Sequence, residues 1–142
     1  MLKKLCLVFT LTVIGAGIIS AGNAAETGLA PQSSNAGGIK VTVVPQNLTM
    51  KVQIWDFEVT LETHTQPLND DLSGVSTLVA DGKQYASLGW KGAPPGGHHR
   101  KGSLRFGAIS PQPSSVELQI RLAGDSAPRS FNWILKGAKN DQ

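Results

Sequence analysis

The feature that most constrains the fold of this chain is an alternation of apolar and polar residues with a period of two. Between residues 55 and 62 the odd positions are apolar and the even positions are polar: Trp55, Phe57, Val59 and Leu61 alternate with Asp56, Glu58, Thr60 and Glu62. Side chains of a β-strand point alternately to its two faces, so this pattern predicts a strand with one buried and one solvated face. A helix would instead repeat its apolar residues every three or four positions.

The same alternation recurs further along the chain. Residues 116–122 and 131–135 repeat it, and shorter strand-like runs occupy residues 39–44, 75–80, 84–88 and 103–108. Asp81-Gly82 between two of these runs is typical of a two-residue hairpin turn. About seven short strands predict an all-β fold, a single antiparallel β-sandwich of the immunoglobulin-like kind, with a small closed barrel as the alternative. The expected core contains Trp55, Phe57, Phe106, Leu118, Phe131 and Trp133.

The first residues have the composition of an export signal. Lys3 and Lys4 precede an uncharged apolar run from residue 5 to residue 19, and small residues surround the expected cleavage site after Ala24. This run fits the roughly 7–15 apolar residues of a signal better than the about 20 of a membrane-spanning helix. We therefore expect residues 1–24 to be a signal peptide, with an uncleaved N-terminal anchor as the alternative. The protein is then periplasmic or secreted and has no integral membrane segment after cleavage.

The rest of the chain is expected to hold one domain without cysteine. The single cysteine, Cys6, lies within the signal, which excludes disulfides and thiolate chemistry from the mature protein. Residues 25–38, rich in Gly, Ser and Asn, are predicted to be a flexible leader, residues 39–136 the sandwich, and residues 137–142 a disordered tail. Loss of the two lysines of the signal lowers the formal net charge from +3 to +1, which gives no reason to expect nucleic acid as a partner.

One segment differs from the rest in composition: residues 90–106 read WKGAPPGGHHRKGSLRF. Proline fixes φ and glycine permits positive φ, so the run of two prolines and two glycines indicates special backbone geometry. We expect residues 90–102 to form a long loop that carries the binding surface. Its candidate residues are Trp90, Gly96, Gly97, His98, His99 and Arg100.

This segment is one of three that together resemble a known kind of domain. The others are VQIWDFEVTLETHT at residues 52–65 and PLNDDL at residues 67–72. In these segments the chain is similar to a domain that recurs in small exported or membrane-tethered bacterial and archaeal proteins, and GGHHRxG is the most specific motif. The resemblance covers residues 50–135 and implies an immunoglobulin-like accessory domain of unassigned function. It supplies no catalytic role for His98, His99 or Arg100.

The three histidines suggest a metal site. His64 falls on the polar face of its strand with Glu62, and a loop folded over that end of the sheet would bring His98 and His99 to them. Imidazole and carboxylate ligands suit Cu(II) or Zn(II). In the competing interpretation, one histidine braces the glycine turn through a hydrogen bond and the other lies on the surface.

Two other ligand sites can be formulated from the sequence. Lys91, Lys101 and the residues from Gly96 to Arg100 could cradle a carboxylate or phosphate, or these cations could pair with Asp70 and Asp71. Residues 69–74, Asn-Asp-Asp-Leu-Ser-Gly, resemble the start of a calcium loop. However, Ala80 stands where a bidentate glutamate is required, and turn chemistry explains the run better.

No catalytic motif is present after residue 24: GxSxG, HExxH, GxGxxG and the P-loop are all missing from the sequence. We therefore predict a non-catalytic exported accessory domain, without a cofactor, that binds another envelope protein through residues 90–102. The alternative is a periplasmic copper- or zinc-binding domain that uses His64, His98, His99 and Glu62.

Overall fold

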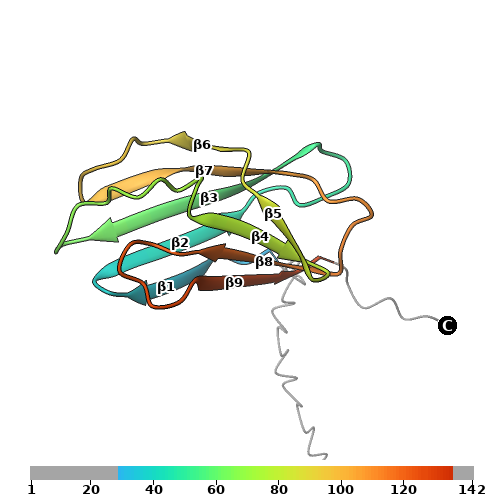
Figure 1. Cartoon of the computed structure of the whole chain (residues 1–142). Helices are drawn as coiled ribbons and strands as arrows, with labels where there is room; N and C mark the ends of the chain where they lie inside the picture. The colour runs from blue at the N-terminus through green and yellow to red at the C-terminus, as the bar shows by residue number, and fades with distance from the viewer. Residues whose placement is uncertain (1–28, 136–142) are drawn as a thin grey trace, which may run out of the picture.

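The computed structural model describes residues 29–135, which form two antiparallel β-sheets packed face to face (Figure 1). One sheet has the strand order β1-β2-β3-β7-β6 and the other β5-β4-β8-β9. The strands are β1 (Gln32–Ala36), β2 (Ile39–Pro45), β3 (Ile54–Thr63), β4 (Ser76–Ala80), β5 (Lys83–Ala86), β6 (Gly89–Gly92), β7 (His99–Gly107), β8 (Ser115–Ile120) and β9 (Arg129–Ile134). The predicted all-β antiparallel sandwich is confirmed, with nine strands in place of about seven.

Within residues 29–135 no helix is long and apolar enough to cross a membrane. The signal peptide predicted for residues 1–24 and the tail predicted for residues 137–142 lie outside the described residues.

The period-two alternation of β3 determines which side chains form the core. The apolar side chains at its odd positions 55–61 are fully buried between the sheets, whereas Glu62 on the other face is exposed. The ring of Phe57 lies 5.8 Å from that of Phe106 on the neighbouring strand and 5.6 Å from that of Trp133 in the opposite sheet. All six residues expected in the core are buried. Each fully buried large apolar side chain contributes about 1.5–3 kcal/mol to stability.

The leader expected at residues 25–38 is partly wrong, because residues 32–36 form β1. This strand pairs with β2 from Gln32↔Val43 to Ala36↔Ile39. Its side chains are mostly polar, so its pairing is stabilised by backbone hydrogen bonds and leaves no period-two apolar pattern in the sequence. Gly37 and Gly38, both at positive φ, make the turn into β2.

The loop expected at residues 90–102 is also shorter than predicted. Residues 90–92 belong to β6, and β7 begins at His99, so the connection spans only residues 93–98. The two strands form a hairpin with register Gly89↔Arg105 to Gly92↔Gly102. We call residues 89–107 the β6–β7 hairpin.

The two sheets close against each other on one side. There β1 lies beside β9, and the carboxamide of Gln32 accepts a hydrogen bond from the backbone N–H of Asn132 at 2.9 Å and donates one to its carbonyl. This side chain therefore covers part of the free edge of β9. On the opposite side β5 and β6 are the edge strands, and residues 87–88 pass from one sheet to the other (Figure 1).

Four connections gather at one end of the sandwich, at the left of Figure 1: residues 37–38, 64–75, 93–98 and 121–128. We call this the loop end. The buried guanidinium of Arg129 binds the carboxylate of Asp125 at 2.9 and 3.1 Å and donates to the carbonyls of Ile39 and Ala36 at 2.7 and 2.9 Å. It thereby ties the β8–β9 connection to the β1–β2 hairpin across the two sheets.

Candidate functional site: the hairpin and the loop end

A glycine pair lets the two strands of the β6–β7 hairpin approach closely. Gly92 and Gly102 stand opposite each other, and a Cβ on Gly102 would lie 2.6 Å from Cζ2 of Trp90 and 2.7 Å from Cα of Gly92. No larger residue fits at either position without a shift of the backbone. The partly buried indole of Trp90 lies against Gly102 and donates from Nε1 to the carbonyl of Ala93 at 2.8 Å.

Arg100 is buried at the base of this hairpin, with 1% of its surface exposed. Its Nη1 donates to the carbonyls of Leu68 and Asp70 at 3.1 and 2.7 Å, and its Nη2 donates to the carbonyl of Ala93 at 3.3 Å. The guanidinium carbon lies 5.6 Å from the ring centroid of Trp90, within the range of a cation–π contact. Arg100 therefore joins residues 67–72 to the hairpin from the inside.

Burial and the nearby acids have opposite effects on the pKa of Arg100. Burial lowers the pKa of this guanidinium, and the negative charges of Asp70 and Asp71 act in the opposite direction. Its Nε is buried without a hydrogen-bond partner among the described residues. Burial of a cation with one unsatisfied nitrogen costs free energy. Stabilisation of the core alone therefore does not explain why Arg100 holds this connection.

The connection at residues 93–98 is also held by its own backbone. Gly96 donates to the carbonyl of Leu68 at 2.8 Å, Leu68 donates back to Gly97 at 2.9 Å, and Thr63 donates to His98 at 3.0 Å. Gly96 and Gly97 have φ of +116° and +70°, as their sequence predicts. The anion cradle considered in the sequence analysis lacks two of its donors here, because the N–H of Gly96 already bonds to Leu68 and the guanidinium of Arg100 bonds to backbone carbonyls.

The four candidate metal ligands come together at the loop end. Glu62 stands opposite His99 in the register of β3 and β7, and these two, with His64 and His98, line one hollow of about 490 Å³. The loop thus lies over the end of the sheet as the metal hypothesis requires. Lys40, the register partner of Glu62 on β2, lines the same hollow.

These four side chains are nevertheless not arranged as a metal site. Within residues 29–135 no group of three His, Cys, Asp or Glu side chains is placed to hold a metal ion. The positive charge of Lys40, which lies beside Glu62, also repels a metal cation that enters this hollow. A metal would therefore have to reorganise these side chains to gain a third protein ligand. His98 contributes to the turn through its backbone carbonyl.

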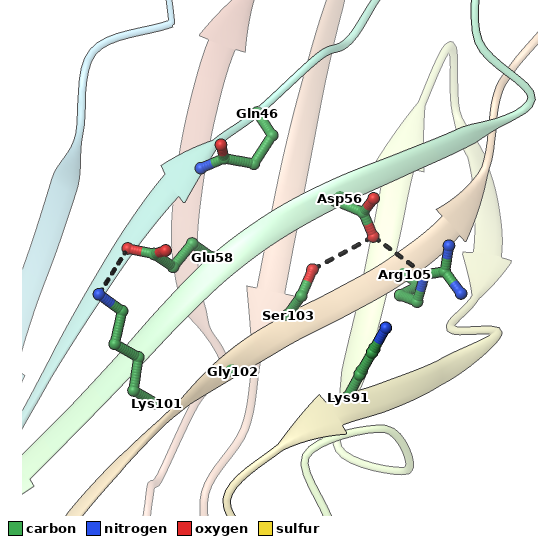
Figure 2. Close-up of a pocket in the computed structure, with 8 residues that line it drawn as sticks. All are labelled: Gln46, Asp56, Glu58, Lys91, Lys101, Gly102, Ser103 and Arg105. Carbon is green, nitrogen blue, oxygen red and sulfur yellow. Dashed lines mark hydrogen bonds and ion pairs between the residues drawn. The ribbon is translucent and has the colours of Figure 1, made fainter.

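A second hollow, of about 570 Å³, lies on the outer face of the five-stranded sheet (Figure 2). Lys101 Nζ pairs with Glu58 at 3.2 Å, and Asp56 accepts bonds from Arg105 Nε at 3.1 Å and from Ser103 Oγ at 3.2 Å. Lys91 on β6 faces the same hollow and forms no ion pair within the described residues. The remaining lining residues are Gln46 and Gly102.

Sequence analysis missed this second hollow. It places Asp56 and Glu58 on a solvated face, but it does not show that β7 and β6 lie beside β3. The available signal is the alternation of Lys101, Ser103 and Arg105 with Gly102 and Leu104, which indicates a second polar strand face.

The acidic run at residues 69–74 serves as a turn. Asp71 accepts a hydrogen bond from the backbone N–H of Ser73 at 3.1 Å, and Asp70 accepts one from Ala123 at 2.9 Å. The bond from Ser73 to Asp71 is the local side-chain-to-backbone bond that favours Asp in turns, whereas the bond from Ala123 to Asp70 ties this run to the connection between β8 and β9. The interpretation of this run as a turn is confirmed.

Comparisons of the chain with protein-family models, with curated proteins and with solved structures find no match. The resemblance noted in the sequence therefore stays a prediction, and the geometry of the chain itself must support any function.

Proposed function

We propose that this protein is a non-catalytic, exported accessory domain that binds another envelope protein through the β6–β7 hairpin. One observation carries the proposal: the buried Arg100 fixes the shape of an exposed connection by binding three backbone carbonyls at 2.7–3.3 Å. Above this base, Pro94, Pro95, His98 and His99 are exposed.

The energetics support a role for the shape of the hairpin. Burial of a guanidinium without a bonded carboxylate is unfavourable compared with an apolar side chain of similar size. The sandwich already has a continuous apolar core between its sheets. Arg100 and the Gly92–Gly102 pair are therefore best explained by the geometry that they impose on this connection. Such a geometry is expected where a rigid scaffold presents a binding loop.

The chemistry of the surface also favours binding over catalysis. In the outer hollow Glu58 pairs with Lys101 and Asp56 pairs with Arg105. Exposed ion pairs within one protein contribute little to stability. Charges arranged on such a face can be matched by opposite charges of a partner, which gives an interface its specificity.

The proposal is tested by photo-cross-linking in cells that produce the protein. A photoreactive amino acid replaces His98 at the loop end or, as the control, the exposed Ser114 in the connection between β7 and β8. We expect a discrete adduct with one envelope protein from position 98 and none from position 114. Equal adducts from the two positions, or none from position 98, would contradict the proposal.

A variant of the same protein separates shape from chemistry. Gly96→Val should abolish the adduct, because φ of +116° disfavours any side chain while open space around this Cβ leaves the rest of the fold intact. His99→Gln, which keeps the shape, should retain it. Circular dichroism of both variants checks that the sandwich is folded.

Metal binding is a second candidate function, favoured by the hollow that collects His64, His98, His99 and Glu62. Calorimetric titration of the metal-free protein with Cu(II) and Zn(II) tests it, beside the double variant His98→Ala/His99→Ala. Stoichiometric binding that the double variant loses would support this function. Equal weak binding in both proteins would refute it.

A further inference from the structure

The edge of β6 is open along its length. β6 has a neighbour only on the β7 side, and no described strand lies beyond it in Figure 1. Ala93 donates to the carbonyl of Lys101 at 3.0 Å, in register with the hairpin. Because inward and outward backbone groups alternate in an antiparallel pair, Lys91 also bonds toward β7, and the N–H and C=O groups of Trp90 and Gly92 point outward.

The edges of β9 and β6 differ in whether a side chain covers them. The edge of β9 is covered at Asn132 by the carboxamide of Gln32. At β6 the residue that precedes the strand, Leu88, is a large apolar side chain that is 64% exposed. Proteins normally blunt or cover open strand edges, because free N–H and C=O groups accept a strand from another chain. An open edge beside an exposed leucine is suited to that kind of addition.

The charges beside this edge indicate what kind of strand fits. Lys91 points to the outer face, next to a hollow whose two acids are already paired with Lys101 and Arg105. A residue directly opposite Lys91 on an added antiparallel strand would point to the same face, with Cβ atoms about 4.5–5.5 Å apart. An acidic side chain at that place pairs with Lys91, whereas a basic one is repelled.

The same geometry disfavours a second copy of this chain as the added strand. Antiparallel pairing of two β6 strands that uses all the outward groups of Trp90 and Gly92 sets Lys91 opposite Lys91 of the other copy. Like charges directly opposite each other are destabilising. Edge lysines are a common means of preventing such self-pairing.

We propose that the partner protein adds an extended strand to β6 and places an acidic side chain opposite Lys91. This inference rests on the proposed function and specifies how the partner binds: backbone bonds to Trp90 and Gly92 hold the strand, and Lys91 selects its sequence.

Two synthetic strand peptides of alternating Thr and Val, with a central Glu or a central Lys, provide the probe. Each is titrated into the isotope-labelled protein, and the backbone amide signals are followed by NMR. We expect the Glu peptide to shift the amides of Trp90 and Gly92 and to bind about threefold to fivefold more tightly than the Lys peptide. Lys91→Glu should reverse this order. Lys91→Arg should keep it, and so should Lys51→Glu, which makes the same change in net charge at an exposed site elsewhere.

Any of several results would overturn the inference. These are β6 amides that the peptides leave unchanged up to about 1 mM, shifts that map to β5 or β9, or a preference for the Glu peptide that survives in Lys91→Glu. A dimer in which the β6 amides are protected without peptide would show that a second copy is the occupant. Cross-links from position 98 with unchanged β6 amides would refute strand addition alone, whereas the absence of those cross-links would refute the proposed function.

Discussion

Replacement of Arg100 by lysine separates the buried charge from the shape of the guanidinium. Lysine keeps the positive charge but offers one compact ammonium in place of a planar fork. It therefore cannot hold carbonyls from residues 67–72 and from Ala93 together while it lies over Trp90. We expect Arg100→Lys to loosen the hairpin at its base and to lower the free energy of unfolding of the domain.

The size of this loss of stability depends on which of the three carbonyls keep a hydrogen-bond donor in the variant. The carbonyl of Leu68 also accepts from Gly96 at 2.8 Å, and that of Ala93 also accepts from Trp90 Nε1 at 2.8 Å, so both stay bonded. The carbonyl of Asp70 loses its 2.7 Å bond to the guanidinium. One hydrogen bond to a charged group contributes about 1.5–3 kcal/mol. We therefore expect a loss of about 2 kcal/mol, or a Tm lower by about 10 °C.

Urea unfolding followed by tryptophan fluorescence measures this loss by linear extrapolation. The matched control is Arg121→Lys, because Arg121 is exposed and a surface change of this kind stays within about 0.5 kcal/mol. If Arg100→Lys is as stable as the unmodified protein to within about 0.5 kcal/mol, the carbonyl bonds of Arg100 do not hold the hairpin and the reasoning fails.

Three further predictions concern other parts of the fold. Gly102→Ala should destabilise the domain by about 1–3 kcal/mol in urea unfolding, because its Cβ meets a heavy atom at 2.6 Å, whereas Gly107→Ala, with open space, should change stability little. Hydrogen bonding to Arg129 lowers the pKa of Asp125 below its unfolded value, so the stabilisation is present at neutral pH and is lost as pH falls below about 4; Asp125→Asn should flatten stability measured from pH 7 to pH 3. Gln32→Ala should uncover the edge of β9 and increase self-association in light scattering, and unchanged scattering would show that the edge needs no cover.

The fold was predictable where the sequence alternates. β3, β8 and β9 each place apolar residues on one face, so their existence, and the burial of Trp55 and Trp133, followed from the period alone. β1 was missed, because it pairs through its backbone and carries polar side chains.

Residues 90–102 of the hairpin were mistaken for a loop for a related physical reason. The inward positions within these residues are Trp90, Gly92, Arg100 and Gly102, so the apolar alternation that marks a strand is broken there by two glycines and a cation. Sequence analysis grouped Arg100 with the surface candidates, because burial of an arginine depends on carbonyls 7 to 32 residues away. Long-range contacts of this kind leave no local pattern.

The candidate site was only partly predictable. Glu62, His64, His98 and His99 line one hollow, because the solvated face of β3 leads directly to the loop end, while their use as metal ligands stays a prediction. The outer hollow and the open edge of β6 depend on the strand order β3-β7-β6, which joins segments distant in sequence.

Whether the edge of β6 is free to accept a strand is tested most directly by amide hydrogen exchange of the protein alone, resolved by NMR. The expected result is alternation: fast exchange at Trp90 and Gly92, and protection at Lys91 and at Ala93, whose N–H bonds to Lys101 at 3.0 Å. Protection of Trp90 and Gly92 equal to that of Lys91 would show that the edge is already covered, and would contradict binding by strand addition.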